Sequence, residues 1–172
     1  MARPRFHLLA TAPLAWALYR RLGMAAAAGA VASGVLIDGD HLVDYLWTRW
    51  RKQKSHYFAP LHAWELATAA LVLAALVWQA GTDGKPRPRS VRGRQSRPAR
   101  SLPVGRARAL LTGLAAGWWL HLVQDVLTNR PEHWGTYTLF FRASRGFARH
   151  ATGWANHRSF HDWSHRPWYE WF

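Results

Sequence analysis

The stretch GVLIDGDHLVDYL, residues 34–46, joins an apolar run to a cluster of acidic side chains. Asp38, Asp40, His41 and Asp44 fall within seven residues of a 172-residue chain that has only nine acidic residues in total. An apolar run of this kind predicts a buried segment, and the charged residues mark the place where it ends. The stretch therefore predicts a polar site at the end of an apolar helix.

Composition restricts the kinds of protein and of site that are possible. The chain fits one domain, and its net charge of +14 favours a partner or environment that is anionic. Its twelve tryptophans are a large excess, and tryptophan gathers at membrane–water interfaces. The absence of cysteine excludes disulfides and thiolate metal sites, so any metal must be bound by histidine and carboxylate.

Four apolar stretches, 6–19, 22–37, 66–82 and 109–124, indicate an all-α fold. A membrane-spanning helix needs about 20 residues, which the last two stretches reach when their polar ends are included. The first two are short and resemble a helical hairpin. We therefore predict a polytopic membrane bundle of about four helices, with a soluble four-helix core as the alternative. The basic residues near the N-terminus suggest a signal peptide, but Pro13 and the Arg20-Arg21 pair argue against one.

A strongly basic segment, residues 85–108, separates the third and fourth stretches and contains nine positive charges and no acid. Its proline, glycine and serine predict a disordered loop, and the positive-inside rule places it in the cytoplasm. Nucleic-acid binding is not favoured, because the segment has no recognisable motif and no aromatic residue between its arginines. We predict a multi-pass protein of a bacterial-type inner membrane, with a helical domain over residues 1–130.

Residues 131–172 form an aromatic and histidine-rich tail, which we predict to lie at the membrane interface. His157, His161 and His165 repeat every four residues and would line one face of a helix. They could bind a further metal or line a substrate groove. The interfacial role is the favoured interpretation.

The predicted topology brings acids and histidines from four helix ends to the outer membrane face. Unpaired carboxylates near lipid are costly and repel one another, whereas a divalent cation with histidine co-ligands stabilises them. We therefore predict a metal site from His7, Asp38, Asp40, His41, His62, His121 and Asp125. His41 could instead support a ligand rather than bind the metal.

Each element of this pattern also has a simpler interpretation. A His–Asp pair spaced i, i+4, such as His121 and Asp125, is often only a hydrogen-bonded pair. The sequence DGDH at 38–41 could be a helix C-terminal turn, and Asp44 could pair with a nearby arginine. The metal hypothesis rests on all four sets meeting at one face.

The order of these elements resembles a family of inner-membrane-associated metal-dependent hydrolases, also described as LexA-binding. The matching elements are His7, DGDH (38–41), KSHYFAPLHAWELA (54–67) and HLVQD (121–125). The family is related to zinc-dependent phospholipases C and single-strand nucleases, so the resemblance implies phosphoester hydrolysis and one to three zinc ions. It implies as ligands His7, Asp38 or Asp40, His62, His121 and Asp125. Ile37 departs from the proline common in the family, and a helical His-x-x-x-Glu has no clear counterpart.

We therefore expect a membrane-bound, zinc-type hydrolase of a lipid or lipid-linked phosphoester. Glu65 or Asp44 is the candidate general base. Membrane lipids are the expected partners, and the sequence carries no prediction of oligomeric state. The alternative is a non-enzymatic metal-binding, transport or scaffold protein. A transporter places its ionisable groups near the middle of its helices, whereas here they lie at helix ends.

Overall fold

The computed structural model describes residues 4–51, 58–82, 103–129, 133–148 and 151–152. In these residues every regular element is a helix, as the four apolar stretches predict. The elements are α1 (Pro4–Leu22), α2 (Met24–Leu36), α3 (Gly39–Arg51), α4 (Trp64–Thr82), α5 (Pro103–Asn129), the short 3-10 helix η1 (Trp134–Tyr137) and α6 (Leu139–Ser144).

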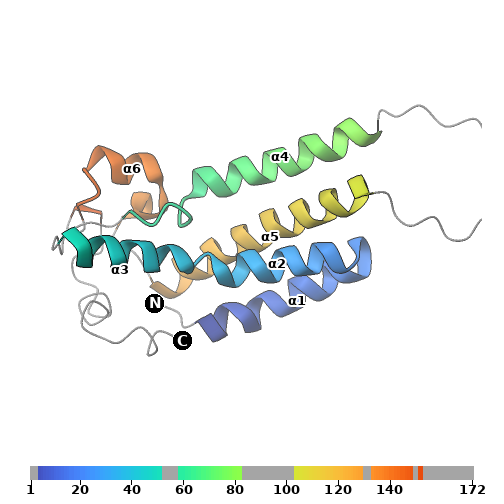
Figure 1. The fold of residues 1–172 in the computed structure, drawn as a ribbon, viewed down its shortest axis with the longest axis horizontal. Coiled ribbons are helices and arrows are strands. Elements are labelled where there is room, and N and C mark those ends of the chain that lie inside the picture. The colour runs from blue at the N-terminus through green and yellow to red at the C-terminus, as the bar shows by residue number, and fades with distance from the viewer. Residues whose placement is uncertain (1–3, 52–57, 83–102, 130–132, 149–150, 153–172) are drawn as a thin grey trace, which may run out of the picture.

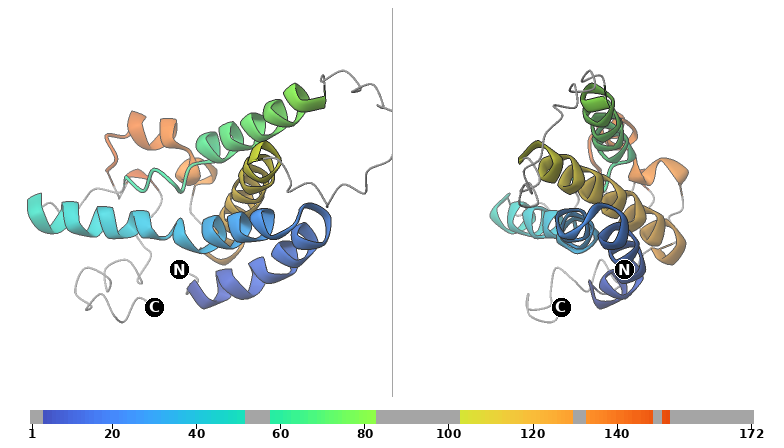
Figure 2. Two further views of the ribbon diagram at one scale, coloured as in Figure 1. Left: turned by 45° about the vertical axis from the view of Figure 1, so that its right-hand side comes forward. Right: turned by 90° about the vertical axis from the view of Figure 1, so that its right-hand side faces the viewer.

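Helix α1 turns back sharply into α2, so the two run antiparallel, side by side (Figure 1). Only Gly23 separates them, and its φ of 86° is a conformation that glycine adopts without strain. Helix α3 then continues close to the direction of α2 (Figure 2). The predicted hairpin is therefore present, and the acidic cluster lies where α2 passes into α3.

Helices α2 and α5 make the most extensive contact between helices, and α5 also packs against α1 and α4. Small residues allow this close approach, because a Cβ added at Gly113 of α5 would collide with the backbone carbonyl of Ala26. Gly117 meets Ala30 in the same way. The backbones of α2 and α5 thus touch directly, which fixes the relation between their ends.

The prediction of a membrane-spanning bundle is wrong. Within the described parts of the chain, no helix combines the length and the apolar character needed to cross a bilayer. Helices α2 and α3 have 13 residues each, about 20 Å against a hydrocarbon core of about 30 Å. The predicted inner-membrane location, with a cytoplasmic loop and an outer-face site, is contradicted by the same finding.

The longer helices α1, α4 and α5 are not long enough in apolar residues to cross a bilayer, because charged or polar residues shorten their apolar runs. Arg20 and Arg21 occupy the last turn of α1, and α5 contains Arg106, Arg108 and Asp125. In α4 the apolar run between Glu65 and Gln79 has 13 residues, again about 20 Å. The last two apolar stretches reach spanning length only when these polar ends are counted as part of the helix.

Two predicted boundaries also differ from the structure. Helix α5 begins at Pro103, so residues 103–108 of the predicted disordered segment are helical. The rest of that segment, 85–102, lies outside the described residues, as do His157, His161 and His165. Part of the predicted tail belongs to the main core, because Tyr137 is buried together with Ala59, Ala67 and Leu122. The structure therefore gives no reason to separate residues 133–148 from the bundle.

Candidate metal centre

The buried polar residues concentrate at one end of the bundle, where several helices begin or end. Among the described side chains, those that are buried and carry histidine or carboxylate groups are His7, Asp40, His41, His62, His121 and Asp125. His7 comes from α1, His62 from the segment before α4, and His121 and Asp125 from α5. The sequence prediction that distant elements converge is therefore correct in its geometry.

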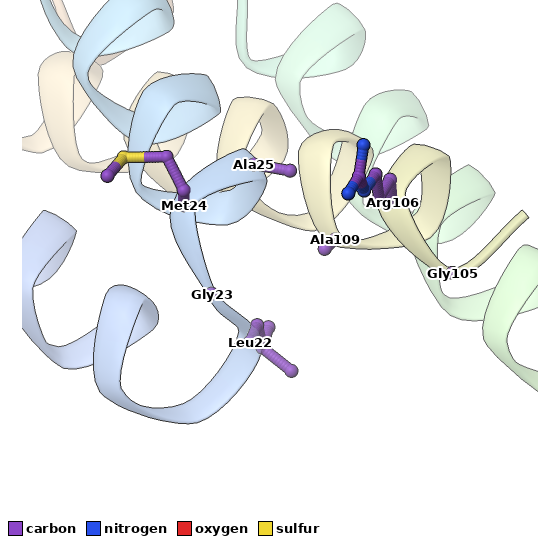
Figure 3. Close-up of a pocket in the computed structure, with 7 residues that line it drawn as sticks. All are labelled: Leu22, Gly23, Met24, Ala25, Gly105, Arg106 and Ala109. Carbon is purple, nitrogen blue, oxygen red and sulfur yellow. The ribbon is translucent and has the colours of Figure 1, made fainter. Parts of the chain in front are cut away.

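An open hollow of about 720 Å³ lies elsewhere, between the α1–α2 turn and the start of α5 (Figure 3). It is lined by Leu22, Gly23, Met24, Ala25, Gly105, Arg106 and Ala109. This lining contains no histidine, carboxylate or hydroxyl group. The hollow therefore offers no acid–base or metal chemistry, and the polar end of the bundle is the candidate site.

Asp38, His62, His121 and Asp125 form a group whose ligand atoms all lie within 4.8 Å of one another. His62 Nε2 lies 3.1 Å from Asp125 Oδ2 and 3.4 Å from Asp38 Oδ1. His121 Nε2 lies 3.4 Å from Asp38 Oδ1, 3.7 Å from Asp125 Oδ2 and 3.2 Å from His62 Nε2. Ligands about 2.0–2.1 Å from a tetrahedral zinc ion are about 3.3 Å apart, so these separations fit such an ion.

The histidines point the correct nitrogen toward this group. His121 Nδ1 donates a hydrogen bond to the Gly34 carbonyl at 3.0 Å, and His62 Nδ1 donates to Asp40 at 2.9 Å. A neutral imidazole carries one N–H, so both Nε2 atoms then hold a lone pair directed inward. Two lone pairs 3.2 Å apart repel each other unless a proton or a cation lies between them. The donor set therefore suits a cation.

His7 approaches the same carboxylates from the other side. Its Nδ1 donates to Gln124 Oε1 at 2.9 Å, which leaves Nε2 facing inward. That Nε2 lies 3.4 Å from Asp125 Oδ1 and 3.9 Å from Asp38 Oδ2, the oxygens that do not face His62. Each aspartate thus presents one oxygen to the His62–His121 pair and the other to His7.

The pKa values of the carboxylates are shifted to favour the charged form. Burial alone raises the pKa of Asp38, but hydrogen bonds from His121 and His62 outweigh it and hold that pKa well below its usual range. Burial opposes ionisation of Asp125 too, and His62 again outweighs it, so that pKa is lowered. Burial likewise raises the pKa of Asp40, but the charge and hydrogen bond of His62 lower it overall.

The pKa values of the buried histidines shift in opposite directions. Burial lowers the pKa of His62, but Asp40, Asp125 and Asp38 together raise it well above its usual range. Burial dominates at His41, where it lowers the pKa to about 4, and it also lowers the pKa of His7. Without metal, the raised pKa of His62 favours a second ring proton, on the Nε2 atom that faces the cluster.

Asp40 occupies a different place from Asp38. Asp40 accepts hydrogen bonds from the backbone amides of Leu61 and His62 as well as from the His62 ring. Asp40, His41 and His62 also form a compact group, and within it His62 Nδ1 donates a hydrogen bond to Asp40. We interpret Asp40 as the residue that orients His62 and fixes its tautomer.

Glu65 is not a member of either compact group. Glu65 Oε1 accepts a hydrogen bond from the Phe140 amide at 3.0 Å, so this carboxylate caps the start of α6. Burial opposes its ionisation, but backbone donors lower its pKa. Asp44 lies on α3, and its side chain is outside the described part of the structure. The contact with α6 does not support the expected general-base role for Glu65, and the role of Asp44 stays a prediction.

Sequence reasoning missed two residues that shape the site. Gln124, which binds His7, was visible in the sequence HLVQD three residues after His121, where helical spacing puts the two on neighbouring faces. Arg142, fully buried on α6, had no signal, because it lies in a segment that resembled an exposed aromatic tail.

No protein-family profile, curated protein or solved structure matches this chain significantly. The resemblance inferred from the short motifs therefore stays an expectation.

Proposed function

We propose that this protein is a metal-dependent hydrolase of phosphoesters, with zinc as its ion. The observation that carries the proposal is the group of Asp38, His62, His121 and Asp125, whose ligand atoms have the spacing of a tetrahedral ion. Two neutral imidazoles and two carboxylates suit zinc, and two such carboxylates balance its charge. A divalent ion held by these residues would supply Lewis acidity toward a phosphoryl oxygen and, at a coordination position left open, would lower the pKa of bound water.

Each aspartate has a second carboxylate oxygen that faces His7, and this favours a catalytic site over a purely structural one. Four protein ligands make a closed site, whereas catalytic zinc sites keep one position open. His7 Nε2 lies 3.9 Å and 3.4 Å from the outer oxygens of Asp38 and Asp125, which marks a second, less complete position outside the four-ligand group. We propose that this second position is the open one, so that the active protein holds two ions.

Among the described residues of the site, Asp38 has the most accessible side chain. Asp38 is about one-fifth exposed, whereas the side chains of His7, His62, His121 and Asp125 are almost fully buried. A substrate therefore reaches the centre past Asp38. Apolar side chains within four positions of a ligand in the sequence, including Phe6, Leu42 and Phe58, are exposed. These exposed side chains support a substrate with an apolar part, such as a lipid or lipid-linked phosphoester.

A non-enzymatic metal-binding role is the second candidate. It is favoured if only the closed four-ligand position fills, because that position offers no place for a substrate. The number of ions per chain separates the two candidates.

The test combines metal analysis with hydrolysis of a chromogenic phosphodiester and of labelled phospholipid vesicles. We expect two zinc ions per chain, hydrolysis that a chelator abolishes and zinc restores, and loss of both in Asp38→Asn. Asp83→Asn, which changes a carboxylate outside the described residues, controls for the lost charge. A wild-type protein without bound metal, or activity that chelation leaves unchanged, would overturn the proposal. One ion and no activity would favour the second candidate.

A further inference from the structure

The short segment that presents His62, residues 58–62, is held by many hydrogen bonds from outside it. Asp40 accepts from the amides of Leu61 and His62 at 2.8 Å and 3.2 Å. Trp118 Nε1 donates to the Leu61 carbonyl at 2.6 Å. The segment also contains Ala59 at a φ of 31°, which a residue with a side chain rarely adopts. A backbone in this conformation persists only where its surroundings impose it.

Arg142 donates three further hydrogen bonds to this segment. Its Nη1 donates to the carbonyls of Phe58 and Ala59 at 2.6 Å and 2.8 Å, and its Nη2 donates to the His62 carbonyl at 2.9 Å. The side chain is fully buried, and it belongs to α6, about 80 residues later in the chain. The planar guanidinium fork allows one side chain to bind three carbonyls of one turn at once.

Helix α6 is itself fixed at its start to the same region. Glu65 lies three residues after His62, and its Oε1 accepts a hydrogen bond from the Phe140 amide. The nearby positive charge of Arg142 also lowers the pKa of Glu65. The residues on either side of the ligand are thus tied to α6, once through a carboxylate and once through the guanidinium. Burying the charged side chain of an arginine costs free energy, and the hydrogen bonds that it makes must offset this cost.

We propose that Arg142 is a positioning residue of the metal centre, which holds the 58–62 segment so that His62 Nε2 faces the other ligands. The presence of a metal in this inference rests on the proposed function, whereas the contacts of Arg142 with the 58–62 segment do not depend on it. The 134–144 segment, which follows helices α1 to α5, is then the part that completes the site. Its role is to set the angle of one ligand rather than to touch the metal or the substrate.

The test uses the full-length chain and cobalt(II), whose visible absorption reports coordination number and geometry. Arg142→Met is compared with Arg145→Met, which removes an exposed arginine of the same segment. We expect Arg142→Met to weaken cobalt binding by about 10- to 100-fold and to change the absorption spectrum, as loss of a ligand's supporting contacts does. Arg145→Met should leave both unchanged.

Arg142→Lys separates positioning from plain stability. An ammonium keeps the charge but not the fork, so we expect partial recovery of affinity and of the wild-type spectrum. The lysine variant also decides the matter if Arg142→Met does not fold. Wild-type cobalt affinity and spectrum in a folded Arg142 variant, even one of lowered melting temperature, would overturn the proposal.

Amide hydrogen exchange keeps this test independent of the metal. In chelator-treated protein, we expect the Leu61 and His62 amides to exchange at least about 10-fold faster in Arg142→Met than in Arg145→Met, because their acceptor would be less well placed. Equal exchange would overturn the positioning role. A wild-type protein that binds no cobalt would instead overturn the proposed function and leave the exchange result to judge Arg142.

Discussion

Helices α2 and α5 contribute to two interiors of opposite character. Along most of their contact the interior is made of glycine and alanine, and Gly113 and Ala26 meet backbone to backbone. At one end the same two helices supply Gly34, His121 and Asp125 to a buried cluster of charges. The glycine and alanine interior has no space for an added Cβ at Gly113. In the polar interior, each ligand would be needed to bind a cation. The tight crossing of backbones is what brings the polar atoms close enough to share a cation.

Removing a ligand from the polar interior should have the largest effect. We expect His121→Ala to lower zinc affinity by about 100- to 1,000-fold, since structural zinc sites gain about 10–16 kcal/mol from four ligands together. His133→Ala removes an exposed histidine and is the matched control. Calorimetric titration with zinc measures both. Equal affinity in the two variants would show that the cluster does not bind the ion.

Acid should lower the free energy of unfolding through the polar interior, because the titratable groups lie there. The pKa of His41 is about 4, against an ordinary value of 6.5, so between these pH values the unfolded chain binds more protons than the folded one. Stability therefore falls as pH falls through this window, by up to about 3 kcal/mol, and His7 acts in the same direction. His62, whose pKa is raised, contributes a constant amount below 6.5. The carboxylates lose their contribution only below pH 3.8.

Urea unfolding of the chelator-treated protein at pH 7, 5.5 and 4.5 measures this effect. His41→Gln should flatten the dependence, because glutamine does not titrate. A free energy of unfolding that stays constant or rises toward pH 4.5 in the wild type would contradict the prediction.

Adding one methyl group at a glycine of α5 should have opposite effects on stability at a packed position and at an open position of the helix. Gly113→Ala places a Cβ against the Ala26 carbonyl and should destabilise the protein by about 1–3 kcal/mol. Gly105→Ala, on the same helix with open space around it, should stabilise it by about 0.5–1 kcal/mol through helix propensity. Chemical unfolding compares the signs of the two changes. If both variants were stabilised, the close contact of α2 and α5 would be refuted.

The sequence predicted the convergence of the site better than its surroundings. Spacing on single helices placed His121 with Asp125, and the alternation of apolar stretches brought His7, Asp38 and His62 to the same end. That argument needs only the order of the helices and not a membrane around them. It held even though the membrane prediction was wrong, because both depend on the same antiparallel arrangement.

The division of labour among the carboxylates could not be predicted. Asp38 and Asp40 are two residues apart, and only the break between α2 and α3 directs the first to His62 Nε2 and the second to His62 Nδ1. Glu65 and Arg142 act through contacts that join segments about 75 to 80 residues apart. Such contacts leave no periodic signal in the sequence, since they depend on how α6 folds back against α4.

The chain has no cysteine, so it cannot close its long loops with disulfides. The side chains of His7 and Gln124, which meet at 2.9 Å, enclose 117 positions of sequence, and His62 joins the same cluster from near the middle. An ion held there would act as a reversible cross-link, restricting the unfolded chain as a covalent bridge does but released by a chelator or by acid. Metal supply would then govern how long the folded chain survives proteolysis, in addition to any chemistry at the site.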